Sequence, residues 1–167
     1  MSPFRQIVKQ SLALLLPSER FLLNGPRQTR DIALTFDDGP DPEQTTALLD
    51  LLKSRDIRGT FFVQGNRAET SPKLVERIVA EGHTLGHHSW SHGEPRETSA
   101  RELVDEIQRT RRLLERIAGV KSNLFRPPKG KLSVEKFREL WRLEQTIVLW
   151  NVDPRDYALQ QGETLDR

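Results

Sequence analysis

Cysteine is absent from the 167 residues, and methionine, tyrosine and histidine are scarce, with one, one and four copies. Without cysteine there are no disulfide bonds, thiolate metal sites or cysteine nucleophiles, so any metal ion must bind to His, Asp or Glu. A charge excess of one sign is also missing, because 26 basic and 24 acidic side chains leave a formal charge of +2. This small surplus predicts no strong attraction to nucleic acid or to anionic lipid.

Long apolar runs are lacking as well. The run at 12–16 has only five residues, far short of the roughly 20 that cross a bilayer. No small-residue cleavage site follows it, so no signal peptide is evident and a cytoplasmic or membrane-peripheral location is favoured. Segment 1–30 is instead expected to hold an amphipathic helix, which either packs on the domain, as we favour, or contacts a membrane surface. Its apolar stripe is formed by Phe4, Ile7, Val8, Leu12 and Leu15.

Length and a 35 % apolar content suit one domain with a single core. From residue 31 to 167, apolar runs alternate with helical patterns, which predicts βα units around a mainly parallel sheet. Such a chain forms an open sheet or an unfinished barrel, and its stop within a βα unit favours the barrel. Strands are expected at 31–36, 59–65, 83–90, 123–128 and 146–152. Helix starts are expected at Asp41-Pro42, Ser71-Pro72, Thr98 or Ser99, and Ser133, and helix ends at Gly82 and Gly119.

The unusual polar residues follow these expected strands. In parallel α/β folds, ligands bind at the carboxyl ends of the strands, where the loops converge. We therefore expect one rim of the sheet to carry the functional site. Its candidates are Asp37 and Asp38 after the first strand, Gly65-Asn66 after the second, His88 and His92 after the third, Arg126-Pro127-Pro128 after the fourth, and 153–156 after the fifth.

The histidines His88 and His92 frame the segment HSWSH. In an extended strand these residues would lie about 13 Å apart. They can share a metal only if the chain turns between them, and Gly93 and Pro95 are consistent with a turn. With a carboxylate from a neighbouring loop, the pair predicts a site for zinc or a similar divalent ion. His83, at the start of the same strand, is expected to pack in the core.

Two groups of arginines are interpreted differently. Arg126 precedes two prolines that stiffen its loop. Alone it would be an exposed residue of a rigid connector, whereas beside Asp37 it could hold that carboxylate by bidentate hydrogen bonds. The Arg-rich run 109–116 shares its helix with acids and therefore indicates a solvated face rather than a nucleic-acid site. These acids are Glu102, Asp105, Glu106 and Glu115.

Four motifs occur in order, namely TFDDGP at 35–40, HSWSH at 88–92, RPPKG at 126–130 and WNVDPRDY at 150–157. Together they resemble the polysaccharide deacetylase family, with its NodB homology domain (carbohydrate esterase family 4), over about 31–157. The resemblance implies a distorted (β/α) barrel. It also implies metal-dependent hydrolysis of N-acetyl, or sometimes O-acetyl, groups on a carbohydrate such as an N-acetylglucosamine-containing poly- or oligosaccharide. Zn²⁺ is the metal expected first, with Co²⁺, Ni²⁺ or Mn²⁺ as alternatives.

Roles for individual residues come from the same resemblance. The metal ligands that it implies are Asp38, His88 and His92. The catalytic residues that it implies are the general base Asp37, its orienting partner Arg126, and Asp156 of the fourth motif, with Asp153 as a nearby alternative. The backbone N–H of Lys129 would stabilise the oxyanion. Lysine departs here from the aromatic residue common in the family.

One motif of the family is not found. A later Leu-x-His supplies the histidine that protonates the leaving amine, and no histidine follows His92. We expect a C-terminally incomplete deacetylase domain rather than a variant that binds metal and glycan with little or no turnover. Hydrolysis of small cyclic amides is a third hypothesis, for which no residue gives positive support. The sequence does not indicate the oligomeric state.

Overall fold

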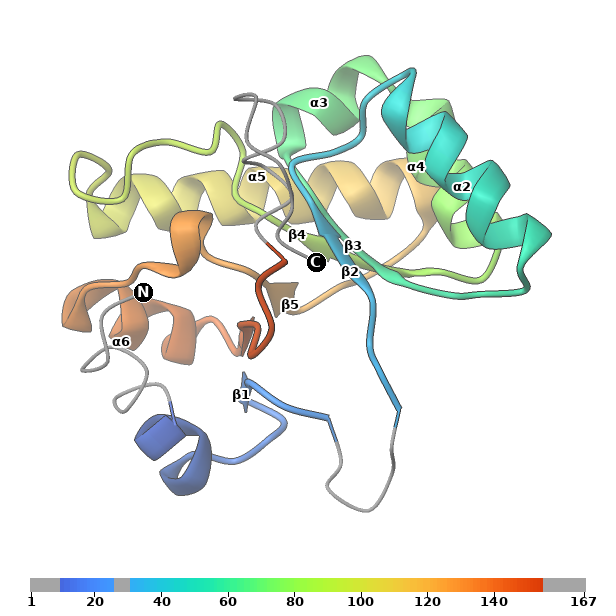
Figure 1. Cartoon of the computed structure of the whole chain (residues 1–167). Helices are drawn as coiled ribbons and strands as arrows, with labels where there is room; N and C mark the ends of the chain where they lie inside the picture. Colours follow the sequence, from blue (N-terminus) through green and yellow to red (C-terminus); the bar gives the residue numbers. More distant parts are fainter. Residues whose placement is uncertain (1–9, 26–30, 155–167) are drawn as a thin grey trace, which may run out of the picture.

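The computed structural model describes residues 10–25 and 31–154, which build an α/β fold around one curled sheet (Figure 1). The strands are β1 (Phe21–Leu22), β2 (Thr35–Asp37), β3 (Thr60–Val63), β4 (Thr84–His87), β5 (Leu124–Phe125) and β6 (Thr146–Val148). Their order is β1-β6-β5-β4-β3-β2, and every neighbouring pair is parallel. The sheet forms a half-barrel, which confirms the predicted fold class. Strands β1 and β2, consecutive in the chain, lie at its opposite edges.

Helices connect the strands and pack against the sheet. They are α2 (Gln44–Ser54), α3 (Gly65–Thr70), α4 (Pro72–Ala80), α5 (Ala100–Ala118) and α6 (Val134–Arg142), with a 3₁₀ turn at Pro128–Gly130. Helix α5 is the longest of them and contacts α3, α4 and α6. Within the described ranges, no helix combines the length and apolar character that crossing a membrane requires.

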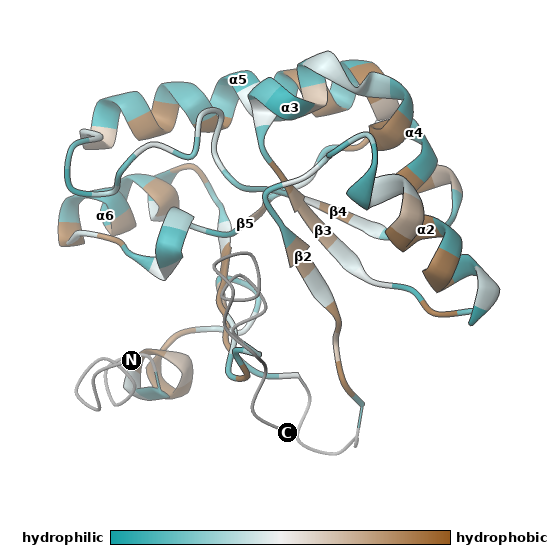
Figure 2. Cartoon of the chain, turned by 45° about the horizontal axis from the view of Figure 1, so that its top comes forward, coloured by the Kyte–Doolittle hydropathy of each residue, from teal (hydrophilic) through white to brown (hydrophobic). Residues whose placement is uncertain are grey.

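Two clusters of buried side chains fill the space between sheet and helices. The first includes Phe61, Val63 and Leu85 from the strands and Leu49 and Ile78 from the helices. The second joins residues of β1, β5 and β6 to residues of α5 and α6: Phe21, Phe125, Ile147, Ile107 and Leu140. In Figure 2, α5 is mainly hydrophilic with hydrophobic patches at intervals, as expected for a helix that buries one face.

Most helix boundaries follow the signals found in the sequence. Helix α2 begins at Gln44, two residues after the predicted Pro42, although Asp41 Oδ1 accepts hydrogen bonds from the Glu43 and Gln44 N–H groups.

Of the two alternatives at 98 and 99, Ser99 is the N-cap of α5. Its hydroxyl accepts a hydrogen bond from the Glu102 N–H, and the Glu102 carboxylate accepts one from the Ser99 N–H. Gly119 ends the helix with a left-handed φ of 66°. Ser133 caps α6 in the same way as Ser99, through the Lys136 N–H.

Two elements were not predicted. Strand β1 has only two residues, too few for an apolar alternation to be recognised. Helix α3 has six residues and begins directly after β3, where only loop residues were expected. The predicted strands are confirmed but shorter; β2, for example, shares two residues with the predicted 31–36 and ends one residue later, at Asp37.

The predicted N-terminal stripe is correct only in part. Helical residues lie at 10–15, and Leu12 packs against the second core cluster, as the preferred interpretation of packing on the domain requires. Leu15, predicted on the same stripe, is 80 % exposed. The side of this short helix that contacts the core carries Leu12, Ala13 and Leu16, so Leu15 faces outward. The other predicted members, at 4, 7 and 8, lie outside the described residues.

Candidate metal centre

Strand β2 delivers two carboxylates to one end of the sheet. Asp37 is its last residue, and Asp38 leaves the strand with a left-handed φ of 65°. The Asp38 side chain is 56 % exposed, and its Oδ1 accepts a hydrogen bond of 2.8 Å from Gln64 Nε2. Because Gln64 follows β3 directly, the neighbouring strand holds this carboxylate in place.

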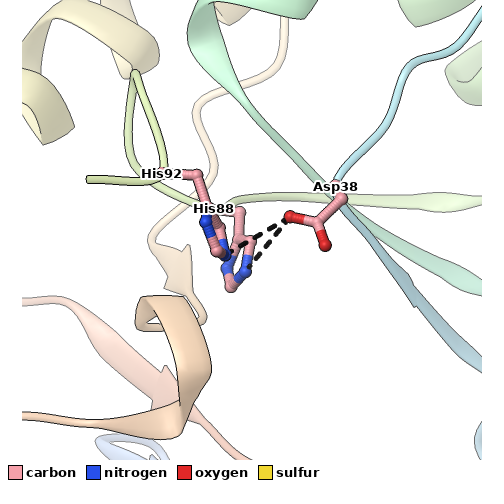
Figure 3. Close-up of side chains that lie close together, drawn as sticks. All are labelled: Asp38, His88 and His92. Carbon is pink, nitrogen blue, oxygen red and sulfur yellow. Dashed lines mark ion pairs between the residues drawn. The ribbon is translucent and has the colours of Figure 1, made fainter. Parts of the chain in front are cut away.

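His88, just beyond β4, turns its imidazole toward Asp38 (Figure 3). Its Nδ1 lies 2.6 Å from the carbonyl oxygen of Arg126. A carbonyl oxygen only accepts, so Nδ1 carries the proton and Nε2 has a free lone pair. This Nε2 is 3.8 Å from Asp38 Oδ1. The carbonyl of Arg126 therefore fixes the tautomer that a metal ligand needs.

His92 reaches the same point because the chain turns sharply after His88. Ser89 and His92 both adopt left-handed φ values, 64° and 55°, and the His92 N–H donates to the Ser89 hydroxyl at 3.1 Å. His92 Nε2 lies 3.4 Å from Asp38 Oδ1, and the two imidazole rings are 4.9 Å apart. The turn predicted within HSWSH is thus present.

The three side chains form one donor set. One ligand atom from each of Asp38, His88 and His92 lies within 4.8 Å of the others. Two imidazoles and a carboxylate are donors that zinc and similar divalent ions accept, with further positions open to water. Among the described residues this is the only cluster of three or more such side chains. The residues therefore fit a divalent metal ion.

Arg126 binds the other aspartate. Its side chain is 3 % exposed, so the interpretation as an exposed connector residue is wrong. Nη1 donates to Asp37 Oδ1 and to Thr35 Oγ1, each at 2.8 Å, rather than forming the predicted bidentate pair. The guanidinium lies 4.1 Å from the centre of the Phe62 ring, which packs beneath it.

Burial governs the protonation of these groups. It raises the pKa of Asp37 above its ordinary value, although Arg126 and His88 act in the opposite direction. Burial also lowers the pKa of His88, and it lowers that of His87, which is hydrogen-bonded to Gln145, to about 3. The His88 imidazole is therefore neutral at pH 7, as metal binding requires, while the carboxylate of Asp37 binds a proton more readily than in water.

A groove of about 890 Å³ runs past these side chains. Lys129 and Asp153 line it together with Asp37 and Asp38. Lys129 has a left-handed φ of 56°, and its ammonium pairs with the Glu94 carboxylate. The backbone donor at Lys129 stays a prediction, and Asp156 lies outside the described residues.

Three further residues, His83, Gln64 and Glu106, differ in how well the sequence predicted their contacts. His83 is buried and accepts a hydrogen bond from the Gly59 N–H at 3.1 Å, as its predicted packing role requires. Gln64 was missed, although it stands one residue before the Gly65-Asn66 pair selected by the strand-end rule. Glu106 was assigned to a solvated face, and this is wrong, because the backbone of the HSWSH segment donates to its carboxylate.

A parallel half-barrel with paired aspartates and two histidines at its strand ends has the architecture of the polysaccharide deacetylases. Residues 24–148 match the family model described as Polysaccharide deacetylase. The chain belongs to this family.

Its relatives include several peptidoglycan deacetylases. A peptidoglycan-N-acetylglucosamine deacetylase of Bacillus cereus is 37 % identical over 147 residues, 87 % of this chain and 53 % of that protein. The peptidoglycan-N-acetylmuramic acid deacetylase PdaC of Bacillus subtilis is 38 % identical over 134 residues, 80 % of this chain and 28 % of that protein. The chain thus spans about half the length of the first relative and less of the second.

A solved structure shares the fold over nearly the whole chain. The Bc1960 peptidoglycan N-acetylglucosamine deacetylase, in complex with 4-naphthalen-1-yl-N-oxidanyl-benzamide, aligns with a TM-score of 0.80 at 34 % identity. The alignment covers 94 % of this chain and 69 % of that one.

Proposed function

We propose that this domain carries out metal-dependent hydrolysis of N-acetyl, or O-acetyl, groups on a carbohydrate, with the amino sugars of peptidoglycan as the substrate class. Family membership and the names of the relatives support the reaction and the substrate class. One observation in this chain itself supports the proposal. Arg126 joins the two halves of the site, because its carbonyl oxygen holds His88 while its guanidinium holds Asp37.

Asp38, His88 and His92 would hold the divalent ion, for which Zn²⁺ is the first candidate and Co²⁺, Ni²⁺ and Mn²⁺ are alternatives. When bound, such an ion polarises an acyl carbonyl and lowers the pKa of a bound water. Asp38 is exposed enough to meet a ligand from the groove, whereas His88 is almost fully enclosed. The site is thus open to the groove.

Asp37 is the residue that we assign as general base. Its pKa is raised by burial, which brings it closer to the working pH and favours proton uptake. The hydrogen bond from Arg126 to Oδ1 fixes the orientation of this carboxylate. The backbone N–H of Lys129 is assigned to the developing oxyanion, and Asp156 keeps the role implied by the fourth motif.

Acetate release tests the proposal. The full chain, supplied with Zn²⁺, is incubated with an N-acetylglucosamine oligosaccharide and with purified peptidoglycan, and acetate is measured. Asp37→Asn is expected to retain metal and to lose about 10²-fold or more of the activity, because proton transfer is typically worth that much. Asp38→Ala and His92→Ala are expected to lose the metal itself.

The outcomes separate the alternatives. Bound metal without acetate release from either carbohydrate would replace the proposal with metal and glycan binding. Hydrolysis of a cyclic ureide, but of neither carbohydrate, would favour the cyclic-amide hypothesis. Retention of metal by both ligand variants would refute the ligand assignment.

A further inference from the structure

The carboxylate of Glu106, on helix α5, contacts the turn beside the candidate metal centre. Oε2 of Glu106 accepts hydrogen bonds from the backbone N–H groups of Trp90 and Ser91, at 2.9 and 3.2 Å. Oε1 accepts a third, of 2.6 Å, from the Ser91 hydroxyl. All three donors lie between His88 and His92. Glu106 therefore binds the segment that joins the two candidate ligands without belonging to the ligand set.

This segment needs an external contact to keep its shape. Ser89 and His92 both have φ values in the left-handed region, which residues other than glycine seldom adopt. Within the turn, a hydrogen bond from the His92 N–H to the Ser89 hydroxyl joins these two residues. If the segment relaxed toward an extended chain, the two imidazoles would separate to about 13 Å. Contacts from outside therefore decide whether they stay together.

Helices α3 and α5 both supply such contacts. At the start of α3, the backbone N–H groups of Gly65 and Asn66 donate to the carbonyl oxygens of Ser89 and Trp90, at 3.0 and 3.1 Å.

Helix α5 supplies the side-chain contacts from one face. Thr110, one helical turn after Glu106, has its hydroxyl 3.2 Å from the carbonyl oxygen of Ser89 and 2.8 Å from that of Glu106, and its one proton is shared between them. Arg109 places its guanidinium 3.4 Å from the centre of the Trp90 ring. The helix is itself held at both ends by the Ser99 capping box and the left-handed Gly119. The turn is thus attached to a rigid element rather than to another loop.

We propose that Glu106 is a positioning residue, which holds His92 within reach of Asp38 and His88 and so sets the affinity of the site for a divalent ion. The inference rests on the proposed function, because it presupposes the Asp38-His88-His92 site. Glu106 is suited to this task because an ionised carboxylate offers only acceptors to the three donors that face it. A glutamine in its place would turn an N–H₂ group toward at least one of them.

The neighbouring residue provides a matched control. Asp105 precedes Glu106 on the same helix and is exposed. Asp105→Asn removes one negative charge at nearly the same place on the helix. It leaves the hydrogen bonds from Glu106 to the HSWSH turn intact. A difference between Glu106→Gln and Asp105→Asn therefore reports the hydrogen bonds rather than the charge of the helix.

The test measures Zn²⁺ affinity of the full chain by competition with a chromophoric chelator, with the Co²⁺ absorption spectrum as a second readout of ligand geometry. Glu106→Gln is expected to weaken Zn²⁺ binding about 10- to 100-fold, the usual effect of removing a residue that orients a ligand. Its Co²⁺ spectrum is expected to change as His92 is released. Asp105→Asn is expected to stay within twofold of the unaltered chain.

A second variant keeps the test decisive if Glu106→Gln folds poorly. Thr110→Val removes the donor to the Ser89 carbonyl with little change of volume, and it is expected to weaken Zn²⁺ binding by a smaller factor in a chain with unchanged circular dichroism. If the folded variants bind Zn²⁺ with affinities within twofold of the unaltered chain, the inference about Glu106 is wrong, whereas the proposed function is unaffected. If the unaltered chain binds no divalent ion, the proposed function fails and this inference fails with it.

Discussion

Replacing Gly65 by alanine is expected to disturb the metal centre from a distance. Gly65 begins α3 and lies under the indole of Trp90. A Cβ at this position would be 2.3 Å from Trp90 Cε3 and 2.6 Å from Thr110 Oγ1. Ordinary van der Waals contact begins near 3.4 Å, so the indole would have to move by about 1 Å. Because Trp90 lies inside the HSWSH turn, this movement is transmitted to His92.

The size of the effect follows from two opposing contributions. Overpacking of this kind destabilises a protein by about 1–3 kcal/mol. Alanine also restricts the unfolded chain, which offsets about 0.4–1 kcal/mol of that loss. With three contacts below 3.0 Å, the upper part of the first range applies, and the free energy of unfolding should fall by about 2 kcal/mol.

Urea denaturation, followed by circular dichroism, measures this change, and a Zn²⁺ titration measures its effect on the site. Gly25→Ala is the control, because a Cβ at 25 meets no atom within 4 Å, and it should change the free energy of unfolding by less than about 0.5 kcal/mol. In a Trp90→Leu background, Gly65→Ala should have a smaller effect, since part of the clash is removed. Equal stability and equal Zn²⁺ affinity of the Gly65 and Gly25 variants would refute the reasoning.

Three further predictions concern single contacts. Gln64→Leu removes the donor to Asp38 and should weaken Zn²⁺ binding about 10-fold in a chelator competition; unchanged affinity would show that this contact does not orient the ligand. Burial lowers the pKa of His83, so the unfolded chain binds more protons than the folded chain below pH 6.5, and stability falls as the pH drops. His83→Asn removes this contribution. In urea denaturation of the metal-free chain, the free energy of unfolding should therefore fall less between pH 7 and pH 5 in the variant than in the unaltered chain, and an equal fall would contradict this. A double-mutant cycle of Phe62→Leu and Arg126→Met should give a coupling of about 1 kcal/mol from the ring beneath the guanidinium; a coupling near zero would exclude that contribution.

The residues that could be predicted share one property, which is their place at the end of a strand. Asp37 and Asp38 lie at the end of β2, His88 follows β4 and Arg126 follows β5. Parallel strands bring such positions to one rim whatever the details of packing. The same rule placed His92 there once a turn was inferred. The order of the elements and the donor types could therefore bring these residues to one site, whereas the separate roles of Asp37 and Asp38 came from the family resemblance.

The residues that were missed depend on contacts between distant segments. In the sequence, Glu106 looks like Glu102, since both are acids on one amphipathic helix. Glu102 belongs to a capping box, whereas Glu106 binds the HSWSH turn. The contact of Glu106 exists because α5 crosses that turn, which the sequence does not show. Strand β1 was missed for a similar reason, because two residues form a strand only where β6 offers a partner.

The pairing of β1 with β6 has a consequence for the order in which the chain folds. Phe21 pairs with Ile147, so almost the whole described domain separates the two partners. At a synthesis rate of about 5–20 residues per second, roughly 6–25 s pass between the appearance of β1 and that of β6. During this time the apolar side chains of Phe21 and Leu23, buried in the finished fold, have no sheet to join. Strand β1 therefore has to wait for β6, made last among the described strands, before it can pair and bury these side chains.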